Sequence, residues 1–174
     1  MRKVILGVAV SLDGFIEGPN GEYDWCFTDQ DYGMSDFVNR IDAVFYGRKS
    51  YEMMLKAGPE LANPFGHKKS YVFSNTLTKP YEGTELISGN IKEQVEALKR
   101  MPGKDIWLFG GAILTTTFIN EGLVDELSLA VHPILLGAGT SLFMNMDGRK
   151  HVKLIDSKTY STGLVMLNYE VNKK

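Results

Sequence analysis

The sequence predicts an α/β domain with a mostly parallel central sheet and an antiparallel edge. Apolar segments of strand length alternate with segments of helical periodicity through most of the chain. Near the end, two strand-like segments, 152–160 and 164–171, follow each other across a Ser-Thr-Gly turn, which is typical of a hairpin. Because no linker or internal repeat interrupts this pattern, we expect residues 1–174 to form a single domain.

Composition fits one compact domain and argues against several functional classes. The chain has 174 residues, 44% of them hydrophobic, and a domain of this size buries roughly 70% of the surface that its unfolded chain exposes. The single cysteine, Cys26, excludes an internal disulfide and fits a reducing cytoplasm. A net charge of −2 without a Lys/Arg cluster argues against nucleic-acid binding, and no apolar run is long enough to cross a membrane. We therefore expect a cytoplasmic protein.

The first half of the chain supplies two strands and two helices. The N-terminal segment 1–15 begins like a signal peptide, but no small-residue cleavage site follows, so we interpret residues 3–10 as a buried strand. Glycine, proline and asparagine recur through 11–28, which predicts a long loop of the kind that is usually functional. Helical periodicity predicts helices over 32–41 and 49–56, with a short buried strand over 43–46 between them.

The second half continues the alternation. Val95 and Leu98 share one helical face, and Gly122 is a suitable helix stop. The predicted elements are a strand SYVFS within 67–74, a short strand over 85–87, a helix over Ile91–Arg100, a strand over 106–109, a helix over Ala112–Asn120 and a strand over 127–131.

The segment 105–143 carries a phosphate-binding pattern. An apolar strand ends at Gly110-Gly111 and a helix begins at once, so the first amide N–H groups of that helix have no intrahelical acceptor. The helix dipole adds partial positive charge, and glycine lets a ligand approach the backbone closely. The alternative is a tight strand-to-helix connection without a ligand. The pattern is not the GxGxxG fingerprint, because Ala112 and its successors lack the further glycine.

The same pattern of an apolar strand, a glycine and an immediate helix recurs at Gly47-Arg48-Lys49-Ser50. The Arg48 guanidinium can grip a phosphate with two N–H groups, and the Ser50 hydroxyl can bind an anion or cap the helix. A solvated basic turn is the alternative, and we prefer it for Lys49. Ser74, followed by Asn75 and Thr76, offers hydroxyl groups at a third strand end, although such residues also form ordinary turns.

The carboxyl ends of parallel strands meet at one edge of an α/β sheet, where ligands bind. Val10, Tyr46, Phe73 and Phe109 would each end a strand there. Because three of these ends offer anion contacts, we expect the phosphate backbone of a dinucleotide rather than one small anion.

Five segments carry a family resemblance: VAVSLDGFIEG, DAVFYGRKSYEMM, YVFSNT, IWLFGGAIL and GLVDELSLAVHPILLGAGTSLF. They resemble the dihydrofolate-reductase-like family, nearest to the reductase domain of bacterial riboflavin biosynthesis and its stand-alone relatives. The resemblance covers nearly the whole chain. It implies a three-layer α/β/α fold with a central sheet of about eight strands, and NADPH bound across the strand ends.

The resemblance also implies roles on the cofactor side. Arg48 would face the 2′-phosphate of the adenosine and Ser50 the pyrophosphate. Ser74 would lie along the adenosine ribose phosphate, and Gly110-Gly111-Ala112 would hold the pyrophosphate at a helix start. Ala9 would lie against the nicotinamide.

On the substrate side the resemblance implies fewer residues. The loop 11–18 would cover the nicotinamide, and Gly137 and Gly139 would shape the substrate pocket. Independently of the resemblance, Trp25 and other aromatic residues of its loop could line a site for a flat ring, although packing beneath the loop also explains these residues. The family likeness suggests a homodimer formed through the later strands.

In dihydrofolate reductases a carboxylate on the first helix grips the pterin and governs protonation. Asp29 and Asp31 follow Trp25 and are the candidates for this catalytic role, although neither falls squarely on the family position because the segment before Gly47 is shorter here. The alternative, which we prefer for both residues, is that they cap the following helix.

The leading hypothesis is an NADPH-dependent oxidoreductase that transfers a hydride to a small heterocyclic (pterin- or pyrimidine-like) or carbonyl substrate. The alternative is a non-catalytic, dimeric dinucleotide-binding protein that retains the fold. A riboflavin-pathway reductase is the third candidate, but the sequence lacks the Cys/His zinc ligands of the deaminase to which that enzyme is commonly fused. No His, Cys or carboxylate cluster has metal-ligand spacing, so we expect no metal. We interpret His132, before Pro133, as structural.

Overall fold

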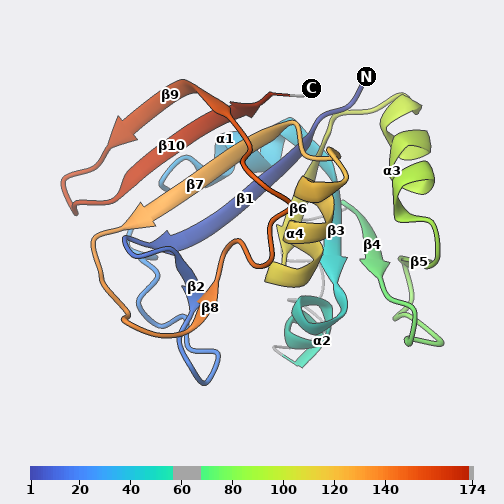
Figure 1. Cartoon of the computed structure of the whole chain (residues 1–174), viewed down its shortest axis with the longest axis horizontal. Coiled ribbons are helices and arrows are strands. Elements are labelled where there is room, and N and C mark those ends of the chain that lie inside the picture. The colour runs from blue at the N-terminus through green and yellow to red at the C-terminus, as the bar shows by residue number, and fades with distance from the viewer. Residues whose placement is uncertain (57–67, 173–174) are drawn as a thin grey trace.

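The structure is a computed structural model that describes residues 1–56 and 68–172, and an eight-stranded sheet forms its centre (Figure 1). The strand order is β5-β4-β3-β6-β1-β7-β10-β9, and a small sheet pairs β2 with β8. The strands are β1 (Val4–Ser11), β2 (Phe15–Glu17), β3 (Ile41–Gly47), β4 (Lys69–Phe73), β5 (Thr84–Ile87), β6 (Asp105–Gly110), β7 (Glu126–His132), β8 (Thr140–Ser141), β9 (Val152–Thr159) and β10 (Val165–Val171). The helices are α1 (Met34–Arg40), α2 (Arg48–Lys56), α3 (Ile91–Arg100) and α4 (Ala112–Asn120).

The strand directions confirm the predicted sheet. β1 runs parallel to β6 and β7, and β3 runs parallel to β4 and β6. β10 is antiparallel to both β7 and β9, which makes the predicted hairpin the antiparallel edge. Central strands such as β1 and β6 are almost continuously apolar because they are covered on both faces.

Two hydrophobic cores, one on each face, produce the three layers. Val95 of α3 and Phe118 of α4 pack with alternate residues of the central strands on one face. On the opposite face Phe37 of α1 and Tyr51 of α2 pack with Val44 and Trp107. Figure 1 shows α4 in front of the sheet and α1 behind it. The predicted α/β/α arrangement is therefore confirmed.

Local backbone geometry explains where element boundaries differ from the prediction. Helix α1 begins at Met34 rather than near residue 32, because Tyr32 and Gly33 have φ angles of 50° and 81° and cannot join a right-handed helix. The predicted loop 11–28 contains the three-residue strand β2, whose partner β8 has only two residues. Elements this short have no detectable periodicity.

The strand in 67–74 is present as β4, whereas His67 lies outside the described residues. Within 1–56 and 68–172, no helix is both long and apolar enough to span a bilayer.

Candidate functional site

A cavity of about 1740 Å³ lies along the carboxyl ends of the central strands. Parallel pairing of β1, β3, β4 and β6 brings these strand ends to one edge of the sheet. Six of the seven predicted cofactor residues line the cavity, namely Ala9, Arg48, Ser50, Ser74, Gly111 and Ala112. The seventh, Gly110, ends β6 directly behind this lining.

Two helix N-termini meet where β3 and β6 end. Helix α2 follows Gly47 at once, and α4 follows Gly111, whose carbonyl accepts the helical N–H of Thr115 at 2.9 Å. The Gly110–Gly111 peptide bond is cis. A methyl group on Gly47 would lie 3.2 Å from the Gly110 carbonyl oxygen and 3.3 Å from the Gly111 nitrogen, so only glycine fits here without displacing the second turn. The two turns therefore form one backbone-lined anion cradle.

The Ser50 hydroxyl reaches this cradle from α2. A methyl group on Gly111 would lie 3.2 Å from the Ser50 Oγ atom, so the hydroxyl and the turn are in near contact. The first-turn amides of α4 have no acceptor inside their helix, and Gly111 provides no side-chain cap. A hydroxyl and uncapped amides converging on one point suit a phosphate oxygen.

The Arg48 guanidinium lies at the outer end of the cradle and is 48% exposed. Its Nε donates to Glu52 Oε1 at 2.6 Å, and its Nη1 donates to Thr76 Oγ1 at 2.5 Å. The Ser74 Oγ accepts from the backbone N–H groups of Thr76 and Leu77 at 3.1 and 3.0 Å. Ser74 therefore stabilises a turn, and Thr76 in that turn contacts the accessible Arg48 guanidinium.

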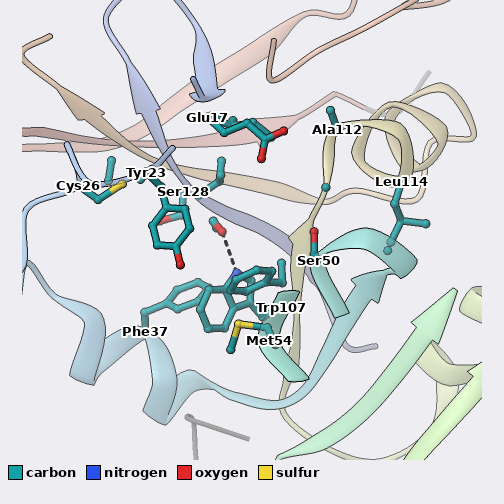
Figure 2. Close-up of a pocket in the computed structure, with 18 of the residues that line it drawn as sticks. Glu17, Tyr23, Cys26, Phe37, Ser50, Met54, Trp107, Ala112, Leu114 and Ser128 are labelled. Atoms are coloured by element: carbon teal, nitrogen blue, oxygen red, sulfur yellow. Dashed lines mark hydrogen bonds between the residues drawn. The ribbon is translucent and has the colours of Figure 1, made fainter. Parts of the chain in front are cut away.

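An aromatic wall made of Phe37 and Trp107 bounds the inner part of the cavity (Figure 2). The two rings meet edge to face with centroids 5.1 Å apart, and the indole N–H of Trp107 donates to the Gly7 carbonyl at 2.8 Å. A methyl group on Gly7 would lie 2.8 Å from the Phe37 ring. Glycine at this position thus allows both rings to pack directly against β1, and Ala9 continues the open floor.

Asp29 and Asp31, the predicted catalytic carboxylates, both lie before α1, but only Asp31 lines the cavity. Asp31 accepts hydrogen bonds from the Ser35 backbone N–H at 3.0 Å and the Ser35 hydroxyl at 2.6 Å. These bonds, the hydroxyl above all, hold the pKa of Asp31 below its usual value. Asp29 accepts from the Tyr32 hydroxyl at 2.7 Å. Both carboxylates therefore organise the start of α1, and Asp31 also faces the cavity.

His132 joins the end of β7 to the loop that contains Trp25. Its Nδ1 lies 2.9 Å from the Ala130 carbonyl, and its Nε2 accepts from the Phe27 backbone N–H at 3.1 Å, which assigns the proton to Nδ1. The Trp25 and Phe27 rings pack edge-on at 5.2 and 5.1 Å. The Trp25 indole donates to the Glu22 carbonyl, and Trp25 is not among the cavity-lining residues. Trp25 thus packs beneath the loop.

The stability of this loop anchor depends on pH. Burial lowers the pKa of His132 below 6.5, so the unfolded chain binds the proton first as the pH falls. We expect the free energy of unfolding to decrease from pH 7.5 to 5.5, and to decrease less in His132→Gln. Urea denaturation at both pH values measures the free energy of unfolding. An equal decrease in wild type and variant between pH 7.5 and 5.5 would contradict this expectation.

Gly137 and Gly139 lie in the loop after β7 and are not among the cavity-lining residues. The Gly137 N–H donates to Asp13 Oδ2 at 2.8 Å. Gly139, with a φ of 146°, passes so close to Glu17 that a methyl group would overlap the Glu17 carbonyl oxygen. Gly137 therefore holds this loop against the β1–β2 connection, and Gly139 holds it against the end of β2.

The sequence left several cavity-lining residues unassigned. Alternate residues of the hairpin face the cavity, namely Asp156, Lys158, Tyr160, Leu164, Met166 and Asn168. Their period of two was visible in the sequence, but the face that it exposes depends on packing between distant strands. In the described part of the chain, no group of three or more His, Cys, Asp and Glu side chains could hold a metal ion.

Comparisons with known proteins agree with this architecture. The family model described as the RibD C-terminal domain matches residues 2–166. The chain is 47% identical over 180 residues to the uncharacterized protein YyaP of Bacillus subtilis (strain 168), covering 98% of this chain and 96% of that protein. A putative riboflavin biosynthesis protein from Shewanella sp. PV-4 has a TM-score of 0.87 at 26% identity, with 99% of this chain and 100% of that chain covered.

A bifunctional enzyme shares the fold. The diaminohydroxyphosphoribosylaminopyrimidine deaminase/5-amino-6-(5-phosphoribosylamino)uracil reductase of Thermotoga maritima has a TM-score of 0.73 at 15% identity. The likeness covers 98% of this chain and 57% of that chain.

Proposed function

This chain belongs to the RibD C-terminal domain family, a family of reductase-type domains, and from that premise we propose that it is an NADPH-dependent oxidoreductase. The proposed reaction transfers a hydride to a small heterocyclic, pterin- or pyrimidine-like, or carbonyl substrate. The observation that carries the proposal is the contact between the Gly47 and Gly111 turns beside Arg48, which joins an anion cradle to an accessible cation.

The residues present suit the phosphates of NADPH. The close approach at Gly47 leaves the α4 amides and the Ser50 hydroxyl available to a pyrophosphate. Arg48, 48% exposed and supported by Thr76, offers its remaining N–H groups to a 2′-phosphate. Ser74 shapes the turn that carries Thr76.

The inner cavity suits the reacting rings. NADPH, when bound, supplies the hydride and its electron pair. The small side chain of Ala9 leaves room for a flat ring over β1, and the wall of Phe37 and Trp107 excludes water from one side. Asp31 is ionised at neutral pH because Ser35 stabilises its carboxylate, so its proposed role is to hold an N–H or protonated group of the substrate. Asp29 positions Tyr32 beside it.

The preference for NADPH over NADH tests the proposed contact between Arg48 and the 2′-phosphate. We expect NADPH to bind at least tenfold more tightly than NADH, because a hydrogen-bonded ion pair with the 2′-phosphate contributes about 1.5–3 kcal/mol. Arg48→Ala should remove most of this preference with little effect on NADH. Fluorescence titration measures both affinities. Lys69→Ala, which removes an exposed cation at the start of β4 that is paired with Glu85 of the neighbouring strand β5, is the matched control and should change neither affinity. Equal affinity of the wild type for the two cofactors would refute the role of Arg48.

Turnover separates the enzyme from the alternative, a dinucleotide-binding protein without activity. Loss of NADPH absorbance with dihydrofolate, pterins, pyrimidinediones or quinones would establish a reductase. Tight NADPH binding with no oxidation of the cofactor across this panel would favour the binding protein. We retain this alternative because Asp31 and His132 both form structural hydrogen bonds.

The proposal includes a homodimer in the cytoplasm. Strand β9 ends the sheet with its eight residues exposed, and Leu154 and Ile155 are 49% and 55% exposed. A second copy would cover these apolar side chains and the open strand edge. Cys26 is free, as expected in a reducing compartment. A monomeric mass in sedimentation equilibrium at micromolar concentration would refute the dimer.

A further inference from the structure

The inner cavity is floored by two rows of residues that cross four strands. In the first row, Gly7 of β1 pairs with Ser128 of β7, Ser128 with Asn168 of β10, and Asn168 with Asp156 of β9. The second row consists of Ala9, Ala130, Met166 and Lys158 in the same order of strands. Residues paired across a sheet point to the same face, and all eight line the cavity.

The first row changes from a residue without a side chain to polar side chains along its length. It begins at Gly7 beneath the aromatic wall, where there is no side chain, and ends in a hydroxyl, an amide and a carboxylate. Figure 2 shows Ser128 lining the cavity with Phe37 and Trp107. The register of β9 and β10 shifts between Asn168 and Tyr169, at the polar end of this row. Such irregularities commonly redirect side chains beside binding sites.

The loop before α1 contacts the hairpin tip beside the floor. The Tyr32 and Tyr160 rings lie 4.9 Å apart, and the Tyr32 hydroxyl lies 3.1 Å from the Thr162 hydroxyl oxygen at the hairpin tip. The Lys158 ammonium lies over the Tyr160 ring, 4.9 Å from its centre. The substrate side is thus a trough with an aromatic wall at one end and polar groups at the other.

The polar groups of the first row are available to a ligand. Among the residues that the structure describes, none forms a hydrogen bond or ion pair with the side chains of Ser128, Asn168 or Asp156. The Asp31 carboxylate, which also lines the cavity, is in contrast held by Ser35 and Gly33. Asp156 is therefore a cavity-lining carboxylate whose oxygens have no partner among the described residues.

We propose that Ser128, Asn168 and Asp156 form a specificity row that recognises the polar edge of a flat substrate. Asp156 accepts N–H groups from that edge, Asn168 donates and accepts beside it, and Ser128 contacts the ring nearer the aromatic wall. The ligand class is a planar heterocycle with amino or ring N–H donors along one edge. This inference deepens the proposed function and rests on it for the position of the reacting ring.

Two probes of similar flatness test the row. The full chain is saturated with NADP⁺ and titrated by calorimetry with 2,4-diaminopyrimidine, which carries N–H donors, and with menadione, which has none. We expect the wild type to bind the diaminopyrimidine, and Asp156→Asn and Asn168→Leu each to weaken it about tenfold, the loss expected for a hydrogen bond to a charged or amide group. Menadione and NADP⁺ affinities should stay within twofold.

Ser157→Ala is the matched control, because Ser157 lies on the same exposed strand but is not among the cavity-lining residues. It should leave all affinities unchanged. The inference is overturned if both row variants bind the diaminopyrimidine as the wild type does, if they weaken both probes equally, or if the wild type binds NADP⁺ but not the diaminopyrimidine. Failure to bind NADP⁺ instead counts against the proposed function, and the same titrations without cofactor then test the row by itself.

Discussion

Gly47→Val is expected to weaken NADPH binding about 100-fold, equivalent to roughly 3 kcal/mol. A side chain at this position meets the Gly110 carbonyl oxygen, the Gly111 nitrogen and the Leu114 Cβ atom at 3.2–3.4 Å. Because two of these atoms belong to the backbone, the variant must push the second turn away, and the pyrophosphate loses one or two charge-assisted hydrogen bonds to the helix start. Titration with NADPH measures the loss, and Gly47→Ala should give a smaller one.

A matched variant separates this effect from general destabilisation. Val44→Ala also changes β3, in the core beneath α2, and should lower the free energy of unfolding by about 1–3 kcal/mol through lost packing. It touches no part of the cradle, so its NADPH affinity should equal that of the wild type at a temperature where both are folded. Equal affinities of Gly47→Val and Val44→Ala for NADPH would show that the glycine contact does not form the cofactor site.

Gly139→Ala should have the largest effect on stability, about 3 kcal/mol or more. The φ angle of Gly139 is 146°, which other residues rarely adopt, and the added methyl group would overlap the Glu17 carbonyl oxygen and lie 3.3 Å from the Gly18 Cα atom. The contact lies beside the β2–β8 pair, where Glu17 faces Thr140. Urea denaturation measures the loss.

Gly148→Ala provides the control for backbone conformation. Gly148 also has a positive φ, 72°, but a methyl group there meets open space, so the substitution should cost only about 1 kcal/mol. If the two variants lose equal stability, the loop 133–140 can move away from β2, and the close approach at Gly139 does not fix it.

The sequence predicted the features that depend on local chemistry. The two helix starts that form the cradle, those of α2 and α4, each follow a buried strand and a glycine, so Gly47, Arg48 and Gly111 could be identified without knowing the strand order. The terminal hairpin was equally visible, because its turn residues and alternation lie within twenty neighbouring positions. These local patterns also predicted that the proposed cofactor residues share one edge, since parallel strands share the direction of their ends.

The features that the sequence did not predict depend on register between distant segments. Gly7 accommodates Phe37 and Trp107, which are 30 and 100 positions away, so nothing near Gly7 indicates an aromatic wall. The specificity row requires the register of four strands together. The start of α1 was misplaced for a local reason, because the left-handed conformation at Tyr32 is unusual for a residue with a side chain.

The strand order has a consequence for the synthesis of the chain. β1 is made first and lies in the middle of the large sheet, yet its partners there are β6 and β7, which end at residues 110 and 132. On the ribosome, the first hundred residues can pair β3, β4 and β5, while β1 has no neighbour to join. The apolar β1 therefore has no partner in the large sheet until residue 110 of the 174 has been made, and lacks its second partner until residue 132. The cradle formed by the Gly47 and Gly111 turns is completed late for the same reason, because its second turn follows β6.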